Sequence, residues 1–287
     1  MTPSFSDLMY FCEVAQTLNI SRAAERLGLS QPSLSASMQR LETALGAKLL
    51  LRSRTGVQLT HVGKDFLFRS RSLISQWEQI RSETLKKEHT VAGQYSIGCH
   101  PSVGLYSLGR ILPELMKKHP FLEIRCEHDL SRKIVERVIS FEIDFGIVIN
   151  PVVHPDLVMK ELCTDTVLFW TRSKPTSLQN PKSEKLVLIC DSNLTQVQKI
   201  LSKTKLQDLK FGRILQTSSL ELAAELVDSG VGVGIIPSRV VEKMKLNRLE
   251  PLNSWPSFKD HLYLVYRADA QKTQAGKEIL SAIRRAF

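Results

Sequence analysis

The sequence predicts an α/β protein in three parts: a small helical head with a β-hairpin, one long helix, and a larger two-lobed α/β domain. Three observations predict this division. Residues 1–60 carry three helix patterns followed by two short β-like runs around a basic tip. Residues 61–90 carry an apolar seven-residue repeat. Residues 91–287 alternate short strands with helices, which is typical of an open, largely parallel sheet.

Composition and charge narrow the class of protein. The chain has 287 residues, 43% hydrophobic and 24% charged, which is ordinary globular composition for about two domains. It contains no apolar run of the ~18 residues that a membrane span needs and no basic-then-apolar leader, so we expect a cytoplasmic protein without a membrane partner. The net charge of +10 favours an anionic partner, nucleic acid first. Both halves are basic, so charge alone does not locate the site.

Two short helices open the head. Ser21 is predicted to cap a second helix over Arg22–Leu27, and Gly28 to supply the turn after it because glycine adopts positive φ without strain. The first helix is predicted from apolar residues at three- and four-residue steps: Leu8, Phe11, Cys12, Ala15 and Leu18.

A third helix follows from Ser30, a capping residue, with Pro32 in its first turn. Leu34, Met38, Leu41 and Leu45 fall within about 40° of one another on a helical wheel, and they predict the buried side. The opposite side is small and polar, as a helix that enters a DNA major groove must be. One alternative is the solvated face of a plain three-helix bundle. On the DNA interpretation, the base-edge candidates are Gln31, Ser33 and Ala36, the phosphate candidates are Ser35, Gln39 and Arg40, and Ser30 and Pro32 start the helix at the groove.

The segment from Leu49 to Thr60 is a β-like run, a basic tip with Gly56, and a second β-like run. It predicts a hairpin wing that presents Arg52 and Arg54 beside the third helix, suited to phosphate or minor-groove contact.

These features together resemble the LysR-type transcriptional regulators. The resemblance implies a winged helix-turn-helix DNA-binding domain over residues 1–60, with double-stranded DNA as partner. Leu50 stands where the family usually has Phe, and Asn19 where it often has Ser. The matching residues are Phe11, Ala15, Ala23, Ala24, Leu27, Ser30, Gln31, Pro32, Ser33, Leu34, Ser35, Leu41, Glu42, Leu45, Gly46, Leu49, Arg52, Leu59, Thr60 and Gly63.

The long helix is predicted to begin after Thr60. Phe66, Leu73 and Ile80 recur every seven residues, with Val62 and Trp77 on the same side. Such a stripe must be buried, either on a second copy of the helix or on its own domain. The family resemblance implies an antiparallel linker-helix homodimer that assembles into a homotetramer. We interpret residues 61–90 as this linker, with 86–90 as a polar hinge.

Residues 91–287 divide into lobe I, about 91–163 and 267–287, and lobe II, about 164–266. Two expectations within them concern local detail: a helix over Leu105–His119 that is interrupted near Pro113, and two separate extended segments, Val158–Leu162 and Val167–Thr171. The Gly-rich run from Gly230 to Pro237 follows a helix and lacks the lysine of a phosphate-binding loop.

The family's regulatory domain is similar throughout this region, at Gly93, Ile97-Gly98, His119-Pro120, Ile143-Asp144-Phe145 and the Gly-rich run. That fold resembles periplasmic solute-binding proteins, which implies a small-molecule effector in the cleft between the lobes. Ligands of open α/β sheets bind beyond the carboxyl ends of strands. Each residue there also suits a helix cap or turn. These effector candidates are His100, Pro101, Ser102, Asp129, Ser131, Asn150, Asp191, Ser192, Thr217 and Ser218.

The hydroxyls and amides among these candidates suit a small anion or polar metabolite, whereas Asp129 and Asp191 do not suit an anion. We find no catalytic motif, and adjacent Cys99 and His100 point to opposite faces of a strand, so we predict neither an enzyme, a cofactor nor a metal site. The mechanism we expect is that the effector biases lobe closure, which changes tetramer packing, the distance between the heads, DNA bending and contact with RNA polymerase.

Two alternatives have other signals or roles. The five cysteines lack a CxxC spacing and are expected to be buried reduced thiols, but a redox sensor would use Cys163 with Cys190, or Cys99 with Cys126. A solute-binding component of a transporter would share the two-lobed domain, but the head argues against it.

Overall fold

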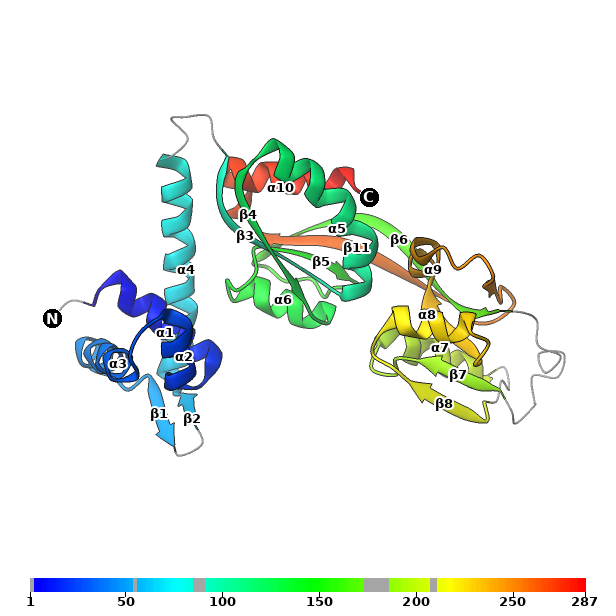
Figure 1. Ribbon diagram of the computed structural model, residues 1–287, viewed down its shortest axis with the longest axis horizontal. Coiled ribbons are helices and arrows are strands. Elements are labelled where there is room, and N and C mark those ends of the chain that lie inside the picture. Colours follow the sequence, from blue (N-terminus) through cyan, green and yellow to red (C-terminus); the bar gives the residue numbers. More distant parts are fainter. Residues whose placement is uncertain (1–2, 54–55, 85–90, 173–185, 207–210) are drawn as a thin grey trace. The chain divides into compact units, whose positions relative to one another are not determined.

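The computed structural model describes residues 3–53, 56–84, 91–172, 186–206 and 211–287 (Figure 1). Packing within the chain divides it into two compact units, residues 1–89 with 140–142 and residues 90–139 with 143–287. Each unit is described by itself. Within the described residues, no helix is both long and apolar enough to cross a membrane.

The first unit is a three-helix head with a hairpin and a long helix, as the sequence predicts. Its core lies between the three helices and the hairpin, where Phe11, Leu34, Met38 and Leu41 are almost fully buried. The elements are α1 (Phe5–Thr17), α2 (Ile20–Leu27), α3 (Gln31–Leu45), β1 (Leu50–Ser53), β2 (Gly56–Leu59) and α4 (His61–Thr84).

Two expectations for the head are wrong. Helix α2 begins at Ile20 rather than Arg22, because Asn19 is its cap and accepts a hydrogen bond from the Arg22 amide at 3.0 Å. Ser21 therefore lies inside the helix and is exposed. Leu45, the last residue of α3, is 42% exposed and does not continue the buried stripe. Gly46 in the left-handed conformation ends the helix there, one turn beyond the core.

Helix α4 continues from the hairpin. The Thr60 hydroxyl accepts a hydrogen bond from the Gly63 amide at 2.8 Å, which confirms the predicted cap. Phe66 packs on the head, with its ring 5.2 Å from that of Phe11. Further along, Leu73, Trp77 and Ile80 are each about half exposed within the unit. The predicted hinge at 86–90 lies outside the described residues.

The second unit is built on one sheet whose described strands run in the order β4-β3-β5-β11-β6-β9-β7-β8, with β10 paired to β6. Two strands, β6 (Leu157–Thr171) and β11 (Phe258–Arg267), are antiparallel to each other and pass through both lobes. Lobe I also contains β3 (Ala92–Cys99), α5 (Pro101–Lys118), β4 (Phe121–His128), α6 (Ser131–Ile139), β5 (Phe145–Ile149), η3 (Ala270–Lys272) and α10 (Gln274–Arg285). Lobe II contains β7 (Val187–Cys190), α7 (Thr195–Leu206), β8 (Arg213–Gln216), α8 (Leu220–Asp228), β9 (Val233–Pro237), α9 (Ser238–Met244) and β10 (Glu250–Pro251).

The α/β class is confirmed, but the sheet is mixed rather than largely parallel. Within lobe I, β3 pairs in parallel with β4 and β5, and within lobe II, β7 pairs in parallel with β8 and β9. The antiparallel pairs all involve the two strands that pass through both lobes. The chain thus forms most of lobe I first and then lobe II. It returns to lobe I along β11 and ends there with α10.

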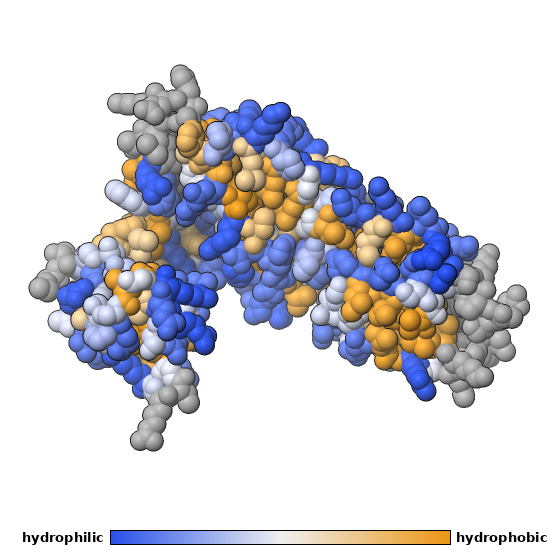
Figure 2. All heavy atoms as spheres, in the orientation of Figure 1, coloured by the Kyte–Doolittle hydropathy of each residue, from blue (hydrophilic) through white to orange (hydrophobic). Residues whose placement is uncertain are grey.

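Helices cover both faces of each lobe. In lobe I, α5 and α10 lie on one side of the strands and α6 on the other (Figure 1). In lobe II, α7 packs in one core and α8 with α9 in another. Apolar atoms also reach the surface over α8 (Figure 2), where Leu222 is 49% exposed.

Two expectations of local detail in this unit are wrong. Helix α5 begins at Pro101, capped by His100, and continues through Pro113. A proline removes one helix hydrogen bond and crowds the carbonyl four residues earlier, which here belongs to the exposed Gly109. The two extended segments at 158–162 and 167–171 are parts of one strand, β6. Threonine and aspartate between them do not break it, since β11 is paired with β6 along this stretch, from Phe258 opposite Val167 to Leu262 opposite Cys163.

Candidate functional site

The outward face of α3 is small, polar and exposed. Ser30 caps the helix, and its hydroxyl accepts a hydrogen bond from the Ser33 amide at 3.3 Å. The Ser30 and Ser33 hydroxyls lie 2.7 Å apart, so each has a partner within the head. Gln31, Pro32, Ala36 and Gln39 are exposed, and they form a surface narrow enough for a major groove.

A buried carboxylate holds α3 in place. Asp7, in the first turn of α1, is 4% exposed and completes a capping box with Ser4. It also accepts a hydrogen bond from the buried Ser37 hydroxyl and pairs with Arg40, whose Nη2 lies 3.1 Å from Oδ1. Burial alone would raise the pKa of Asp7, but the bonds from Ser37, Ser4 and Arg40 outweigh it, and the pKa lies below its usual value. Arg40, a predicted phosphate contact, is therefore oriented from inside the head.

A second buried carboxylate joins α3 to the wing. Glu42 is 6% exposed and accepts hydrogen bonds from the Leu49 and Leu50 amides at 2.9 and 3.1 Å and from Lys48 at 2.8 Å. These bonds orient the start of the hairpin against α3. Burial raises the pKa of Glu42, but these bonds lower it below its usual value.

The predicted hairpin wing is present beside α3. Arg52 in β1 is exposed and donates through Nη1 to the Ser35 hydroxyl at 2.9 Å, which connects two of the predicted phosphate contacts. Gly56 has φ of +135° and lies so close to the Leu18 carbonyl that a Cβ would meet its oxygen at 2.8 Å. The wing is thus positioned against the end of α1 at a residue where any side chain would be strained, so only glycine fits there. Arg54 lies outside the described residues.

The second unit brings one group of effector candidates together across the two lobes. His100 lies at the start of α5 in lobe I and is 7% exposed. Burial lowers its pKa, while the carboxylates of Glu221, Asp191 and Asp129 act to raise it. Asp191 follows β7 and Glu221 opens α8, both in lobe II. Residues after lobe I and lobe II strands therefore face one another electrostatically, as a cleft between lobes requires.

Other effector candidates are engaged in local structure. The Ser131 hydroxyl accepts from the Ile149 amide at 2.9 Å, and Asp129 accepts from the Leu130 amide at 2.8 Å. The Ser192 hydroxyl donates to Gln216 at 2.8 Å, and Thr217 accepts from the Ser219 amide at 3.2 Å. Ser219, rather than Ser218, caps α8. Pro101 and Ser218 are exposed.

Sequence reasoning missed two carboxylates on the strands that pass through both lobes. Asp165 of β6 and Asp260 of β11 are directly opposed in the antiparallel register, and they are 7% and 1% exposed. The predicted Asn150 belongs with them: its amide donates to Asp260 at 2.7 Å, and its oxygen accepts from the His261 amide at 2.9 Å. Burial raises the pKa of Asp165, and burial together with the Asp165 charge raises that of Asp260 to about 6. The available signal was a carboxylate on the alternating face of each strand that is otherwise apolar, between Cys163 and Val167 and between Phe258 and Leu262.

The cysteines show no reactive thiolate. Burial raises the pKa of all five, to about 11 for Cys12 and Cys190 and to about 12 for Cys99. All five are free thiols. A redox switch needs a thiol whose pKa is lowered by nearby cations, and the pKa shifts here have the opposite sign. Among the described residues no group of three or more His, Cys, Asp or Glu side chains is placed to hold a metal ion.

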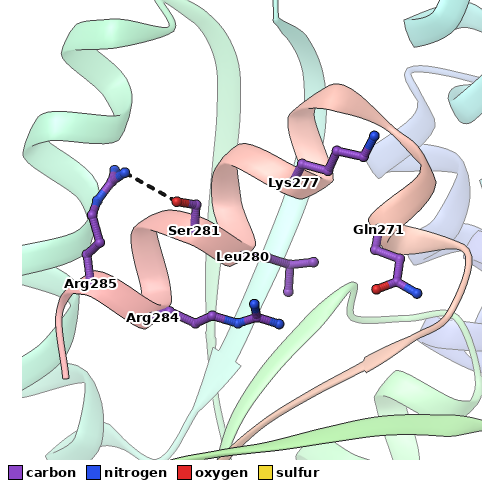
Figure 3. A pocket seen from close by; sticks show the side chains of 6 residues that line it. All are labelled: Gln271, Lys277, Leu280, Ser281, Arg284 and Arg285. Carbon is purple, nitrogen blue, oxygen red and sulfur yellow. Dashed lines mark hydrogen bonds between the residues drawn. The ribbon is translucent and has the colours of Figure 1, made fainter.

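A surface hollow lies along α10, apart from the predicted effector residues (Figure 3). Its basic side chains project from successive turns of the helix, and Arg285 donates to Ser281 at 3.2 Å. None of the sequence-predicted site residues lines it. The residues of the hollow are Gln271, Lys277, Leu280, Ser281, Arg284 and Arg285.

Comparison with known families matches both units. Residues 5–64 match the bacterial regulatory helix-turn-helix protein, lysR family, and residues 88–287 match the LysR substrate binding domain. The chain belongs to the LysR family. It is a LysR-type transcriptional regulator with a DNA-binding head and a domain of the effector-binding type.

Curated LysR-type relatives include the regulator BbuR of Bordetella bronchiseptica, which is 35% identical over 161 residues, 56% of this chain and 50% of that protein. The chain thus aligns with about half the length of that relative. YofA of Bacillus velezensis is 24% identical over 97% of this chain and 96% of its own. HcaR of Escherichia coli, an activator of the hca operon, is 34% identical over 54% of this chain and 52% of its own.

Solved LysR-type structures share the fold along the whole chain. A full-length OxyR variant from Pseudomonas aeruginosa has a TM-score of 0.74 at 21% identity, over 100% of this chain and 96% of that one. The regulator CbnR has a TM-score of 0.63 at 19% identity, over 99% of both chains. These likenesses confirm the fold class of this LysR-type chain.

Proposed function

We propose that this LysR-type regulator reads DNA with the N-terminal half of α3 and holds the backbone with the wing. The supporting observation is that the exposed, small face of α3 stands on a fully buried apolar stripe, while Asp7 and Glu42 fix its orientation. Gln31, Ser33 and Ala36 read base edges. Arg40, Arg52 and Arg54 contact phosphates, as do Ser35 and Gln39 at the flanks. CbnR has been solved in complex with its target DNA, which supports the same mode of binding here.

Helix α4 is proposed to dimerise the chain. Its exposed stripe of Leu73, Trp77 and Ile80 requires an apolar partner, and a second copy of the helix supplies it. We propose that residues 61–90 couple the domain at 1–60 to that at 91–287, and that homodimers assemble into homotetramers. In this arrangement specificity comes from the spacing of several heads as well as from base contacts. The relatives are regulators, and we propose that this chain too acts on transcription through RNA polymerase, in the cytoplasm and without catalysis.

A small-molecule effector is proposed to bind between the lobes, near His100, Ser102 and Asp191. The effector shifts the relative stability of lobe arrangements, and a coupling of about 1–3 kcal/mol between effector and DNA suffices for regulation.

The base-reading assignment is tested by selecting DNA from a random library with the full-length protein. Gln31→Ala should relax the preference at one base pair by about 1–3 kcal/mol, since a bidentate amide contact is lost. Arg52→Ala should leave the selected sequence unchanged but weaken all binding and reduce the slope of log affinity against log salt by about 0.9. Arg132→Ala is the matched control, because it removes one arginine whose side chain is 82% exposed in the regulatory domain.

Two results would contradict the assignment. If Gln31→Ala selects the same sequences as the wild type with equal discrimination, α3 does not read bases through this residue. If Arg52→Ala and Arg132→Ala have equal salt slopes, the wing does not contact phosphate.

A further inference from the structure

The carboxylates of Asp165 and Asp260 interrupt a continuous apolar face. On one side, Cys163 and Leu262 belong to or pack against the core of lobe I. On the other, Val167 and the partly buried Phe258 belong to the core of lobe II. Since side chains two residues apart share a face of a strand, all six lie on one face, with the two carboxylates between the cores. The two carboxylates thus mark the junction of the two cores, where the proposed interlobe effector site lies.

Neither carboxylate has a cationic partner within 4.0 Å among the described residues. Asp260 accepts only amide hydrogens, from Asn150 at 2.7 Å and Gln196 at 3.4 Å. Asp165 accepts the backbone amides of Thr166 at 2.8 Å and Arg239 at 3.4 Å. Like charges opposed across two strands repel, and buried charges are normally paired. The site therefore carries uncompensated negative charge.

The nearest cation is engaged elsewhere. The guanidinium carbon of Arg239 lies 5.8 Å from the centre of the Tyr106 ring, a cation–π contact, and it makes no ion pair among the described residues. It acts on Asp165 only through space, and Glu242 on the same helix opposes it. Arg239 thus does not neutralise Asp165 through a direct ion pair.

A buried hydroxyl without a partner points to the same place. Ser102, in the first turn of α5, is 3% exposed, and its Oγ has no hydrogen-bond partner in the part of the chain that the structure describes. Tyr106 lies one turn further along the same face of the helix, and the negative charges of Asp165 and Asp260 help to raise its pKa. By this helical spacing, Ser102 lies on the same side of α5 as Tyr106, toward Asp165 and Asp260. Buried hydroxyls normally form a hydrogen bond, so the Ser102 Oγ is available to bind a ligand.

We propose that Asp165 and Asp260 form a cation-recognising subsite of the effector cleft, and that the effector carries a protonated amine or guanidinium group. The N–H donors of such a group would bridge the two opposed carboxylates and place another polar atom near the Ser102 hydroxyl. The proposal rests on the proposed interlobe effector site and names the chemical class of its ligand. It differs from the small anion or neutral metabolite that hydroxyls and helix N-termini alone favour.

The ligand cation and the proton compete for Asp260. Burial and Asp165 raise its pKa to about 6, so the carboxylate is largely ionised above that pH and largely protonated below it. The groups that face it are Asp165, His261, Asn150 and Gln196, with Tyr106 at longer range. Binding of a cation should therefore weaken by about tenfold between pH about 8 and pH about 5.

The test uses the full-length protein with agmatine, putrescine and methylguanidinium as probes, at about 10 mM and matched ionic strength, with glutarate as the anionic comparison. Thermal shift identifies binding, and calorimetry measures its affinity. The ammonium and guanidinium probes distinguish the two cation types. At least one cationic probe should bind saturably at pH about 8, and glutarate should not.

Asp260→Asn and Asp165→Asn keep the shape of each side chain and should weaken the cation by about tenfold or more, since each removes one charge from the site. Ser102→Ala should weaken it less. Asp156→Asn, whose side chain is 67% exposed in lobe I, is the matched control and should bind as the wild type does. Circular dichroism checks folding. Should either variant misfold, the pH dependence of the wild type still decides.

Failure of all three cations to bind, or equal affinity in the wild type and Asp260→Asn, would overturn the proposal. Binding of glutarate that is lost in Ser102→Ala would overturn it too, while leaving an effector site between the lobes. If the wild-type protein shows no specific DNA binding in a gel shift, the proposed function of the head is refuted. The cation-binding result is independent of that outcome.

Discussion

Replacing Asp7 by alanine should destabilise the DNA-binding head, because this buried carboxylate holds α3 from beneath its outward face. The carboxylate is 4% exposed and accepts hydrogen bonds from Ser4, Ser37 and Arg40. Its loss leaves the Ser37 hydroxyl, itself 1% exposed, without that partner, at a cost of about 1–3 kcal/mol. The lost capping box adds about 1 kcal/mol. Arg40 is half exposed, so its ion pair adds at most about 1 kcal/mol.

The expected loss of about 2–5 kcal/mol is measured locally by amide hydrogen exchange in the full-length protein. Protection of the core amides of α3, from Leu34 to Leu41, should fall by about 30- to 5,000-fold. Exchange in the regulatory domain should not change. Asp65→Ala is the control: this carboxylate lies on α4 of the same compact unit and is also paired with an arginine, but it is 57% exposed, so its loss should cost under about 0.5 kcal/mol.

A double-mutant cycle isolates the buried bond. In the Ser37→Ala background no hydroxyl is orphaned, so Asp7→Ala should cost about 1–2 kcal/mol less than in the wild type. If the two substitutions are additive, or if Asp7→Ala changes protection less than threefold, about 0.7 kcal/mol, the network does not fix α3 as argued.

Three further outcomes are expected. Because the folded-state pKa of Asp260 is raised to about 6, the folded regulatory domain binds a proton that the unfolded chain binds only near pH 4; its stability should rise as pH falls from about 7 to about 5, by about 1.3 kcal/mol. Asp165 and His261 face this group, so calorimetric melting of Asp260→Asn should show a flatter pH profile, and an unchanged profile would contradict the assignment. Trp77→Glu should convert the oligomer to smaller species in sedimentation while sparing the fold of the regulatory domain; an unaltered mass would exclude the α4 stripe as an interface. Replacing all five cysteines by serine should leave DNA binding with and without peroxide equal to that of the wild type, because burial keeps each thiol protonated; loss of a peroxide effect would instead reveal a redox switch.

Local rules account for what the sequence predicts well. The start of α3 follows from Ser30 and Pro32, and its end from Gly46, all within one helix. The hairpin follows from two β-like runs with Gly56 at the tip. The alternation of short strands with helices in the regulatory domain follows from the periodicity of apolar residues.

The errors arise where tertiary context decides. Leu45 has the right angle for the buried stripe, but helix angle says nothing about where the neighbouring helices end. Asn19 and Ser21 both suit a cap, and the backbone turn after α1 selects Asn19. Pro113 is tolerated inside α5 because the helix is held by packing of Val103 and Leu115 on the lobe I core, which local propensity does not include.

The interlobe carboxylates show why the site is harder to predict than the fold. Asp165 and Asp260 are 95 residues apart in the sequence, and only the register of β6 against β11 brings them together. A rule that searches the ends of strands finds His100, Ser102 and Asn150, which we propose lie near the effector, but it overlooks residues in the middle of strands that continue through both lobes. Because each such strand belongs to two cores, a polar residue between two apolar stretches marks the place where one core stops and the next begins. The same break in pattern that weakens a strand prediction thus indicates the cleft, and its charge indicates what the cleft binds.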